Sequence, residues 1–323
     1  MRRSEAERDS YETARALATV DVPIAHPEDS VEETIERVLG KKYTSASHIV
    51  VLEGNNRLVG VVTAEDLFSA KPENKIRDIM DADPPRVSPD TDRELAVGLA
   101  IQRGEYAVAV VDHYGYFLGL IPPKSLLKVM LEEHQEDISI MAGILEPDDK
   151  TAFYSKASIK TRVLYRLPWL ILGLGGGLVA AGVVTAFEKE LEKNVAIAFF
   201  IPTVVYLADA VGTQTEAIVV RALAMGESVK ISRETLTASA IGLGLFLFSL
   251  FVIAFFWKDL SIALVVSLGI LLASSVAGLI ASLLPKLLDR IKVDPAYGSG
   301  PIATVIQDVI SVAVYLMVCS LLL

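Results

Sequence analysis

The sequence predicts an α/β unit duplicated in tandem, followed by an all-α membrane domain of five transmembrane helices. Three observations support this fold class. Apolar residues make up 52% of the 323 and are concentrated from residue 167 onward. The first half has a charged, soluble composition in which one pattern of helices and strands occurs twice. The mean hydropathy of +0.46 is high for a soluble protein.

The two copies in the first half keep the same order of elements. Each has a proline-containing segment, a helix, a strand, a hairpin turn, a second strand with a glycine, and a further helix. The strands are expected at Ile49–Glu53 and Leu58–Val62, and again at Val108–Asp112 and Phe117–Ile121. The residue pairs in equivalent positions are Pro23/Pro85, Pro27/Pro89 and Gly60/Gly119.

An acidic segment connects the two halves and is predicted to be helical. Its carboxylates Glu132, Glu133, Glu136 and Asp137 fall within about a turn and a half. Like charges at such spacings destabilise a helix by about 0.2–0.5 kcal/mol per pair. A divalent cation would relieve this repulsion, since it prefers oxygen ligands. The alternative is an acidic helix face in water, which is the usual role of a charge run.

Five apolar segments follow, and each has the length of about 20 residues that a helix needs to cross a bilayer. They run over Leu167–Phe187, Val195–Leu223, Leu236–Trp257, Ser261–Leu284 and Pro301–Leu323. Pro202, Asp209 and Gly212 interrupt the second segment, which is expected to be kinked or locally unwound. Small residues in the first segment predict close helix contacts; they are Gly173, Gly175, Gly176, Gly177, Ala180, Ala181 and Gly182.

Basic residues predict the orientation of these segments. They gather before the first segment, between the second and third, and between the fourth and fifth: Lys156, Lys160, Arg162, Arg166, Arg221, Lys230, Arg233, Lys286, Arg290 and Lys292. The positive-inside rule then places the soluble half in the cytoplasm and the C-terminus outside a cell (plasma) membrane. The N-terminal residues lack the apolar core of a cleavable signal peptide.

Carboxylates inside the apolar segments are the candidate functional residues. Burying an ionisable group at bilayer depth costs at least about 2.5–3.5 kcal/mol, so Asp308 is expected to border a water-filled path. Asp209, Thr213, Gln214 and Glu216 offer further oxygen ligands. An all-oxygen set suits Mg²⁺, Ca²⁺ or Mn²⁺ and argues against zinc or copper.

Each of these acids also has a structural alternative. Asp308 could bond a neighbouring hydroxyl group, Asp209 could cap a broken helix, and Glu216 could pair with Arg221.

Composition excludes several classes of function. A net charge of −10 argues against nucleic acid as a partner. A single cysteine, Cys319, excludes a disulfide or a cysteine-based metal site within one chain. The four histidines lie outside the membrane half and are expected in loops or at the surface: His26, His48, His113 and His134. No nucleophile–base pair or phosphate loop is present, so an enzyme is not expected.

The tandem copies, from about Leu17 to Met130, resemble the paired cystathionine-beta-synthase (CBS) domain, a ligand-sensing regulatory module. In that family a Thr-x-x-Asp after the second strand holds a nucleotide. Thr63-Ala-Glu-Asp66 fits this motif, whereas the second copy reads Pro122-Pro-Lys-Ser125 and lacks the Asp. The resemblance therefore implies ATP or another adenosine nucleotide at the first copy only. The alternative is that Thr63 and Asp66 merely cap a helix.

The membrane half resembles the MgtE family of magnesium channels, and the acidic connector resembles that family's plug helix. The matching motifs include Arg166-Leu-Pro-Trp169, Gly212-Thr-Gln, Val219-Val-Arg221, Asp294-Pro-Ala and Ser299-Gly-Pro301. The resemblance implies a homodimer with a central pore in a lipid bilayer. Cytoplasmic Mg²⁺ at the CBS and plug segments would close the pore, and Asp308 would select the ion.

Two departures from the family pattern stand out. Bacterial members usually carry an acidic helical domain before the CBS pair, where this chain has only residues 1–16. The family's Gly-Gly-Asn-Ala-Gly-Thr-Gln reads Ala208-Asp209-Ala210-Val211-Gly212-Thr213-Gln214 here, so an asparagine is lost and an aspartate appears.

The resulting prediction is a Mg²⁺ channel driven by the membrane potential. Its parts are a short segment 1–16, tandem CBS domains 17–130, a plug segment 131–165 and a pore domain 166–323. One alternative is a secondary exchanger of Mg²⁺ against Na⁺ or H⁺, with Asp209 and Glu216 as coupling groups. Another is a CBS-based membrane sensor without transport. The ligands suit Mg²⁺, Mn²⁺, Co²⁺ and Ca²⁺ alike.

Overall fold

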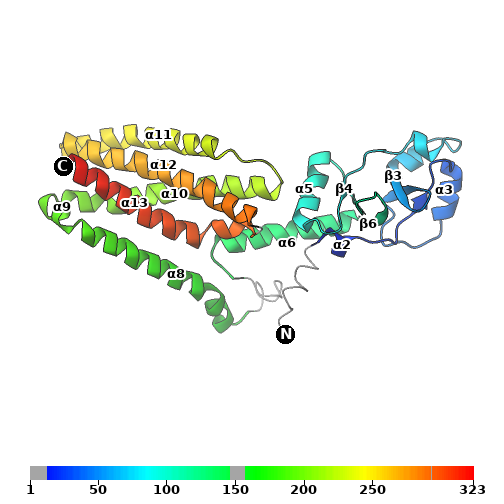
Figure 1. The fold of residues 1–323 in the computed structure, drawn as a ribbon, viewed down its shortest axis with the longest axis horizontal. Helices are drawn as coiled ribbons and strands as arrows, with labels where there is room; N and C mark the ends of the chain where they lie inside the picture. The colour runs from blue at the N-terminus through cyan, green and yellow to red at the C-terminus, as the bar shows by residue number, and fades with distance from the viewer. Residues whose placement is uncertain (1–12, 146–156, 292) are drawn as a thin grey trace. The chain divides into compact units, whose positions relative to one another are not determined.

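The computed structural model describes residues 13–145, 157–291 and 293–323. The chain forms two compact units, Met1–His134 and Gln135–Leu323, which are considered separately (Figure 1). Most of the predicted segment 1–16, part of the predicted plug segment and the basic residues Lys156 and Lys292 lie outside the described residues.

The first unit contains two three-stranded sheets with the same strand order. One holds β1 (Ile24–Ala25), β2 (His48–Glu53) and β3 (Arg57–Thr63); the other holds β4 (Arg86–Val87), β5 (Val108–Val111) and β6 (Phe117–Ile121). In both, the first pair of strands is parallel and the second is antiparallel. Gly60 pairs with Val51, and Gly119 pairs with Val110, next to a register shift in each sheet. The predicted α/β duplication is thus confirmed down to the strand register.

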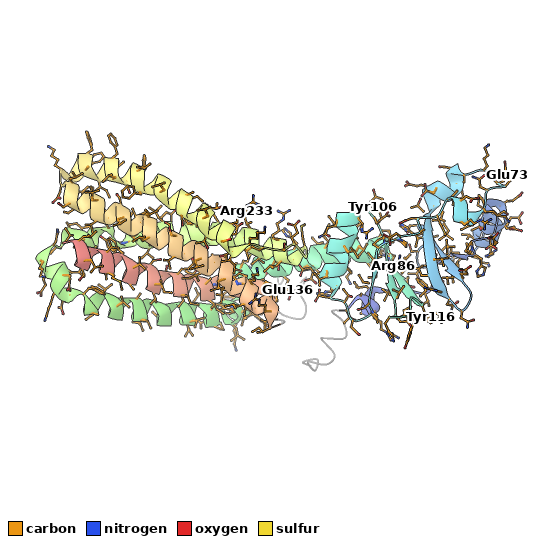
Figure 2. The ribbon with its side chains drawn as sticks, turned by 45° about the horizontal axis from the view of Figure 1, so that its top comes forward. Glu73, Arg86, Tyr106, Tyr116, Glu136 and Arg233 are labelled. Carbon is orange, nitrogen blue, oxygen red and sulfur yellow. The ribbon has the colours of Figure 1, made fainter. Side chains whose placement is uncertain are left out.

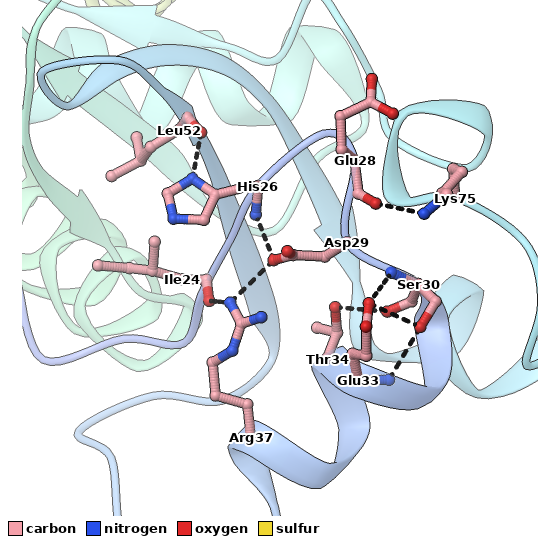
Figure 3. A network of polar contacts seen from close by, with 10 residues as sticks. All are labelled: Ile24, His26, Glu28, Asp29, Ser30, Glu33, Thr34, Arg37, Leu52 and Lys75. Atoms are coloured by element: carbon pink, nitrogen blue, oxygen red, sulfur yellow. Dashed lines mark hydrogen bonds and ion pairs between the residues drawn. The ribbon is translucent and has the colours of Figure 1, made fainter.

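Helices take equivalent places in the two copies. They are α3 (Val31–Val38) and α4 (Ala64–Ser69) in the first copy, and α5 (Arg93–Arg103) and α6 (Pro123–Met141) in the second. The start of α3 is a capping box, in which Ser30 Oγ accepts from the Glu33 N–H at 3.1 Å and the Glu33 carboxylate accepts from the Ser30 N–H at 2.8 Å. Figure 3 shows this cap.

Asp29, next to that cap, connects α3 to the strand before it. Its carboxylate accepts the His26 N–H at 2.8 Å and pairs with Arg37 at 2.8 Å (Figure 3). Burial by itself would raise the pKa of Asp29. The hydrogen bonds from Arg37 and from the His26 amide outweigh burial and hold that pKa below its usual value. The first turn of α3 is therefore fixed by charge-assisted hydrogen bonds.

The segment that precedes each copy pairs with the sheet of the other copy. Thr19, after the short helix α2 (Ala14–Leu17), forms a bridge with Leu120 of β6. Asp81, after the short helix η1 (Ile76–Asp78), forms the equivalent bridge with Val61 of β3. One core cluster contains side chains of both copies, among them Val50, Leu58, Ala109 and Leu120. The two copies are therefore joined by backbone bridges as well as by a common core.

One histidine departs from the expectation of a loop or surface position. His48 begins β2 with 4% of its surface exposed, and its Nδ1 lies 2.9 Å from Ser47 Oγ. Burial lowers the pKa of His48. The prediction was wrong because the register of β2 points this side chain into the protein. His26, His113 and His134 are exposed, as predicted.

The second unit contains five helices long and apolar enough to cross a membrane. They are α8 (Ile159–Ala186), α10 (Ala196–Ala224), α11 (Ile231–Trp257), α12 (Leu260–Arg290) and α13 (Pro301–Leu322), with the short helices α9 (Glu188–Lys193) and η2 (Pro295–Gly298) between them. Helix α12 packs against α10, α11 and α13, and α8 packs along α13 (Figure 1). The predicted all-α domain with five candidate spans is confirmed.

The structure bears on two local expectations for these helices. Helix α10 is continuous through Pro202, Asp209 and Gly212, so its backbone is not unwound. Pro202 lies in the second turn, where it removes only one helical hydrogen bond. In α8 only Gly176 is buried, whereas Gly173, Gly175, Gly177 and Gly182 border open space, because α8 contacts the bundle mainly along α13.

One end of this unit collects the end of α6 and several basic residues. Ile140 of α6 packs with Val220 and Ala296. Lys286 Nζ donates to the Val229 carbonyl at 2.6 Å, which joins α12 to the loop after α10. Figure 2 shows Glu136 of α6 and Arg233 of α11 at this same end of the unit.

Candidate functional site

The three membrane carboxylates lie on two helices that pack against each other, α10 and α13. Asp209 and Glu216 are seven residues apart on α10, which is about two helical turns, so they share one face of the helix. Gly212 lies between them on that face. Asp308 lies seven residues after the start of α13 at Pro301. The structure thus brings together acids that are about 100 residues apart in the sequence.

Asp209 and Asp308 are both partly buried. Asp209 Oδ1 has no hydrogen-bond partner among the described residues, and the side chain of Thr304 on α13 contacts the same carboxylate. The charge of Asp209 acts on both Asp308 and Glu216. Buried polar atoms nearly always have a hydrogen-bond partner. A buried carboxylate oxygen without a donor is therefore available as a ligand.

Glu216 is enclosed between the helices, with 2% of its surface exposed. Gln307 of α13, only 1% exposed, donates a hydrogen bond from Nε2 to Glu216 Oε1. The backbone N–H of Gly300 also donates to the Glu216 carboxylate. Gly212 makes room for this arrangement, since a Cβ at that position would lie 1.8 Å from Gln307 Oε1.

Thr213 and Gln214 lie on a different side of α10, where both are exposed, while Gly212 and Thr215 are buried. The predicted oxygen set is therefore divided between two faces of the helix. In the described part of the chain, no three or more His, Cys, Asp or Glu side chains are grouped so that they could hold a metal ion.

The structure also bears on the alternative structural roles of Asp209 and Glu216. Asp209 lies in the middle of α10 and does not cap a helix. Within the described residues, Glu216 makes no ion pair with Arg221; its partner is Gln307. Sequence reasoning missed Gln307, Thr304 and the contact at Gly212. The available signal was a second polar side chain, Gln307, directly before Asp308 in an otherwise apolar run.

Two of the connector acids are neutralised by cations. Arg93 Nε donates to Glu133 at 2.5 Å, and the Arg93 guanidinium lies 3.9 Å from Glu132. Lys128 lies 3.6 Å from Glu132 on the same helix. Glu136 and Asp137 are partly buried on α6. Glu132 and Glu133 therefore contact cationic side chains in addition to solvent.

The Thr-x-x-Asp motif of the first copy forms a helix cap. Thr63 Oγ1 accepts the Asp66 N–H at 3.0 Å and donates to the Asp66 carboxylate at 2.6 Å, at the start of α4. The sequence analysis gave such a helix cap as the alternative to a nucleotide site. Asp66 remains exposed and Thr63 is partly exposed.

Comparison with protein families gives two matches. The MgtE model, described as a divalent cation transporter, matches residues 201–318, and the CBS domain model matches residues 14–73 and 76–132. The first match contains all five predicted pore residues. The second contains Thr63, Asp66 and Glu132.

Curated relatives carry a matching name. A protein of Thermus thermophilus named magnesium transporter MgtE is 32% identical over 281 residues, which is 85% of this chain and 62% of that protein. A Bacillus subtilis protein of the same name is 29% identical over 278 residues, 84% of this chain and 60% of that protein. The chain therefore spans about three fifths of the length of these relatives. Their names describe transporters and not enzymes, in line with the sequence prediction.

A solved structure is similar to part of the chain. It is the crystal structure of the cytosolic domain of the Mg²⁺ channel MgtE in complex with ATP, which is 26% identical with a TM-score of 0.35. The similarity covers 37% of this chain and 49% of that one.

Proposed function

We propose that this chain carries Mg²⁺ across a membrane, from the premise that residues 201–318 match the MgtE divalent cation transporter model and residues 14–73 and 76–132 match the CBS domain model. The observation that supports this most directly is Asp308, a partly buried carboxylate inside the last apolar helix and within the field of Asp209. Two acids at this depth are costly unless they border water or a cation. A cation path accounts for both.

In this proposal two copies of the chain form a homodimer, and Asp308 of each copy lines a shared aqueous path. The described residues of one chain hold no metal-binding group of three acidic, His or Cys side chains, which favours ligands from two copies. Mg²⁺ loses its waters reluctantly, so Asp308 and Asp209 would hold a hydrated ion through water.

The driving force is the membrane potential. It supplies about 2.3 kcal/mol per charge per 100 mV, hence about 4.6 kcal/mol for a divalent ion. We place the protein in the plasma membrane with the first unit in the cytoplasm and the C-terminus outside. The arrangement of Arg233 and Lys286 at the end of the helical unit that also holds the end of α6 supports this orientation.

Cytoplasmic Mg²⁺ regulates the path in this proposal. It binds at Glu132, Glu133, Glu136 and Asp137 of α6 and favours a closed state by binding that state more tightly. ATP or another adenosine nucleotide would bind at Thr63 and Asp66 of the first CBS copy.

The test is Mg²⁺ influx into proteoliposomes that contain an indicator dye, with the membrane potential as the only gradient. Asp308→Ala is expected to reduce influx at least about tenfold, equivalent to about 1.4 kcal/mol. Asp308→Asn should also lose influx, because it keeps the size of the side chain and removes the charge. Asp289→Ala removes an exposed acid near the end of α12 and should behave as the wild type.

The outcomes separate the possible functions. A wild-type protein without divalent flux, or Asp308→Ala with normal flux, contradicts the proposal. Influx that appears only with a Na⁺ or pH gradient identifies an exchanger instead. Repeating the assay with Mn²⁺, Co²⁺ and Ca²⁺ ranks the ions.

A further inference from the structure

The hydrogen bond between Glu216 and Gln307 is a buried contact between two polar side chains of α10 and α13, two turns of α13 before the buried hydrogen bond from Tyr315 to the Ile197 carbonyl. Both side chains are almost fully enclosed, at 2% and 1% exposed. In the described residues no Lys, Arg or His lies within ion-pair distance of Glu216, and its donors are the Gln307 amide and the Gly300 N–H. Such a group in a membrane helix is retained only where its contacts serve structure or function.

The backbone of α10 is shaped to receive Gln307. Gly212 lies one turn before Glu216 on the same face, and a Cβ there would overlap the Gln307 amide, 1.8 Å from Oε1. Any larger residue at position 212 would push Gln307 away from Glu216. The glycine and the carboxylate together hold the Gln307 side chain in one place.

This contact determines where the next residue of α13 points. Successive residues on a helix point about 100° apart around its axis. With Gln307 held against Gly212 and Glu216, Asp308 points to the side of α13 that also carries Thr304, one turn earlier. The side chain of Thr304 hydrogen-bonds to Asp209, and the charge of Asp209 acts on Asp308. A rotation of α13 that broke the Gln307 contact would also move Asp308 away from Asp209.

We propose that Glu216 and Gln307 are positioning residues: their hydrogen bond over Gly212 fixes the rotation of α13 and thereby places Asp308 in the ion path. This inference rests on the proposed function, because it takes Asp308 as the ion-binding carboxylate. It differs from the sequence prediction for Glu216, which made that side chain a ligand of the ion.

The test compares variants that break, keep or restore the contact, with Mg²⁺ influx as the readout. Gln307→Leu and Glu216→Leu break it. Glu216→Gln keeps a hydrogen-bonding partner without the charge. The double variant Glu216→Gln/Gln307→Glu restores a carboxylate–amide pair with the roles exchanged. Ser311→Ala removes another buried polar side chain one turn further along α13 and is the matched control.

The expected result is a change in ion binding more than in maximal flux. Gln307→Leu should raise the Mg²⁺ concentration for half-maximal influx at least about tenfold, because Asp308 no longer holds its position. Glu216→Gln should lose less than Glu216→Leu. The exchanged pair should recover most of the loss caused by Gln307→Leu, and Ser311→Ala should match the wild type.

Two results would overturn the inference. If Glu216→Gln is as impaired as Glu216→Leu and the exchanged pair is not restored, then the charge of Glu216 contacts the ion directly. If Gln307→Leu binds Mg²⁺ as the wild type does, the contact positions nothing. Failure of the proposed function gives a different result, since the wild-type protein would then carry no divalent flux.

Discussion

Glu105, two residues after the end of α5, is an acid whose surroundings oppose its charge. Burial raises the pKa of Glu105, and the negative charges of Asp81 and Asp66 raise it further. The folded protein therefore holds this proton more tightly than the unfolded chain does. The favourable contribution is complete below the unfolded value near 4.5 and is lost as the pH rises through the folded pKa.

We therefore expect Glu105→Gln to stabilise the first unit at neutral pH but not at pH about 3.5, where the acid is protonated in both states. Hydrogen exchange of the β5 amides, compared with the wild type at each pH, measures the effect. Glu53→Gln changes an exposed acid of the same unit and is the control. Equal stabilisation at both pH values would contradict the electrostatic explanation.

At the scale of single residues, the sequence identified the charged side chains of interest better than it identified the residues that contact them. Asp308 and Asp209 were identified because a carboxylate in an apolar run is costly. The partner of Glu216 was not, because Gln307 lies 91 residues away and their contact depends on how α10 and α13 are rotated. The burial of His48 was missed for a similar reason, since it depends on the register of a strand beginning one residue earlier than predicted.

Helix α8 contacts α13 at Gly176, which offers a test at the scale of elements. A Cβ at Gly176 would lie 2.4 Å from Val305 Cγ1, whereas a Cβ at the adjacent Gly177 meets nothing within 4 Å. Gly176→Leu should therefore separate the two helices and cost about 1–3 kcal/mol of stability, as overpacking does. Gly177→Leu makes the same chemical change in open space and should leave the melting temperature of the detergent-solubilised protein unchanged.

A lower melting temperature for Gly177→Leu than for Gly176→Leu would contradict this packing. It would indicate that the open side of α8 is the one that supports the fold.

The sequence predicted the helices and strands that have a strong periodicity or a long apolar run. It did not predict where these elements begin and end. Helix α8 begins at Ile159, eight residues before the apolar run, because Ser158 caps it and Ser158 Oγ accepts the Thr161 N–H. Helix α10 is continuous through Pro202, although the sequence predicted a kink or local unwinding there. Apolar length gives the part of a helix that lipid surrounds, whereas capping side chains determine where the helix begins.

For the whole molecule, the ion pair between Arg93 and Glu133 bears on regulation. If Mg²⁺ binds at the acids of α6, it must compete with Arg93 and Lys128, which already neutralise Glu132 and Glu133. Arg93→Ala should then lower the cytoplasmic Mg²⁺ concentration that closes the path by up to about fivefold, since such ion pairs contribute about 0.2–1 kcal/mol.

Inhibition of influx by Mg²⁺ on the cytoplasmic side measures this competition. Arg103→Ala removes an arginine at the other end of α5 that pairs with Asp83, and it should not change the inhibition. Replacing Glu132, Glu133, Glu136 and Asp137 together with Ala should abolish the response. Unchanged inhibition in that fourfold variant would refute the regulatory role of α6.

The backbone bridges between the two CBS copies limit how this protein can be shortened or rebuilt. Thr19 forms a backbone bridge with Leu120 at the edge of one sheet, and Asp81 forms the equivalent bridge with Val61 at the edge of the other. A fragment with only one copy would leave a strand edge without its bridge. The segment that precedes this copy could then pair only with such an edge on another molecule. Such fragments should assemble in pairs through swapped tails. A chain cleaved between the copies, in contrast, should give two fragments that stay associated.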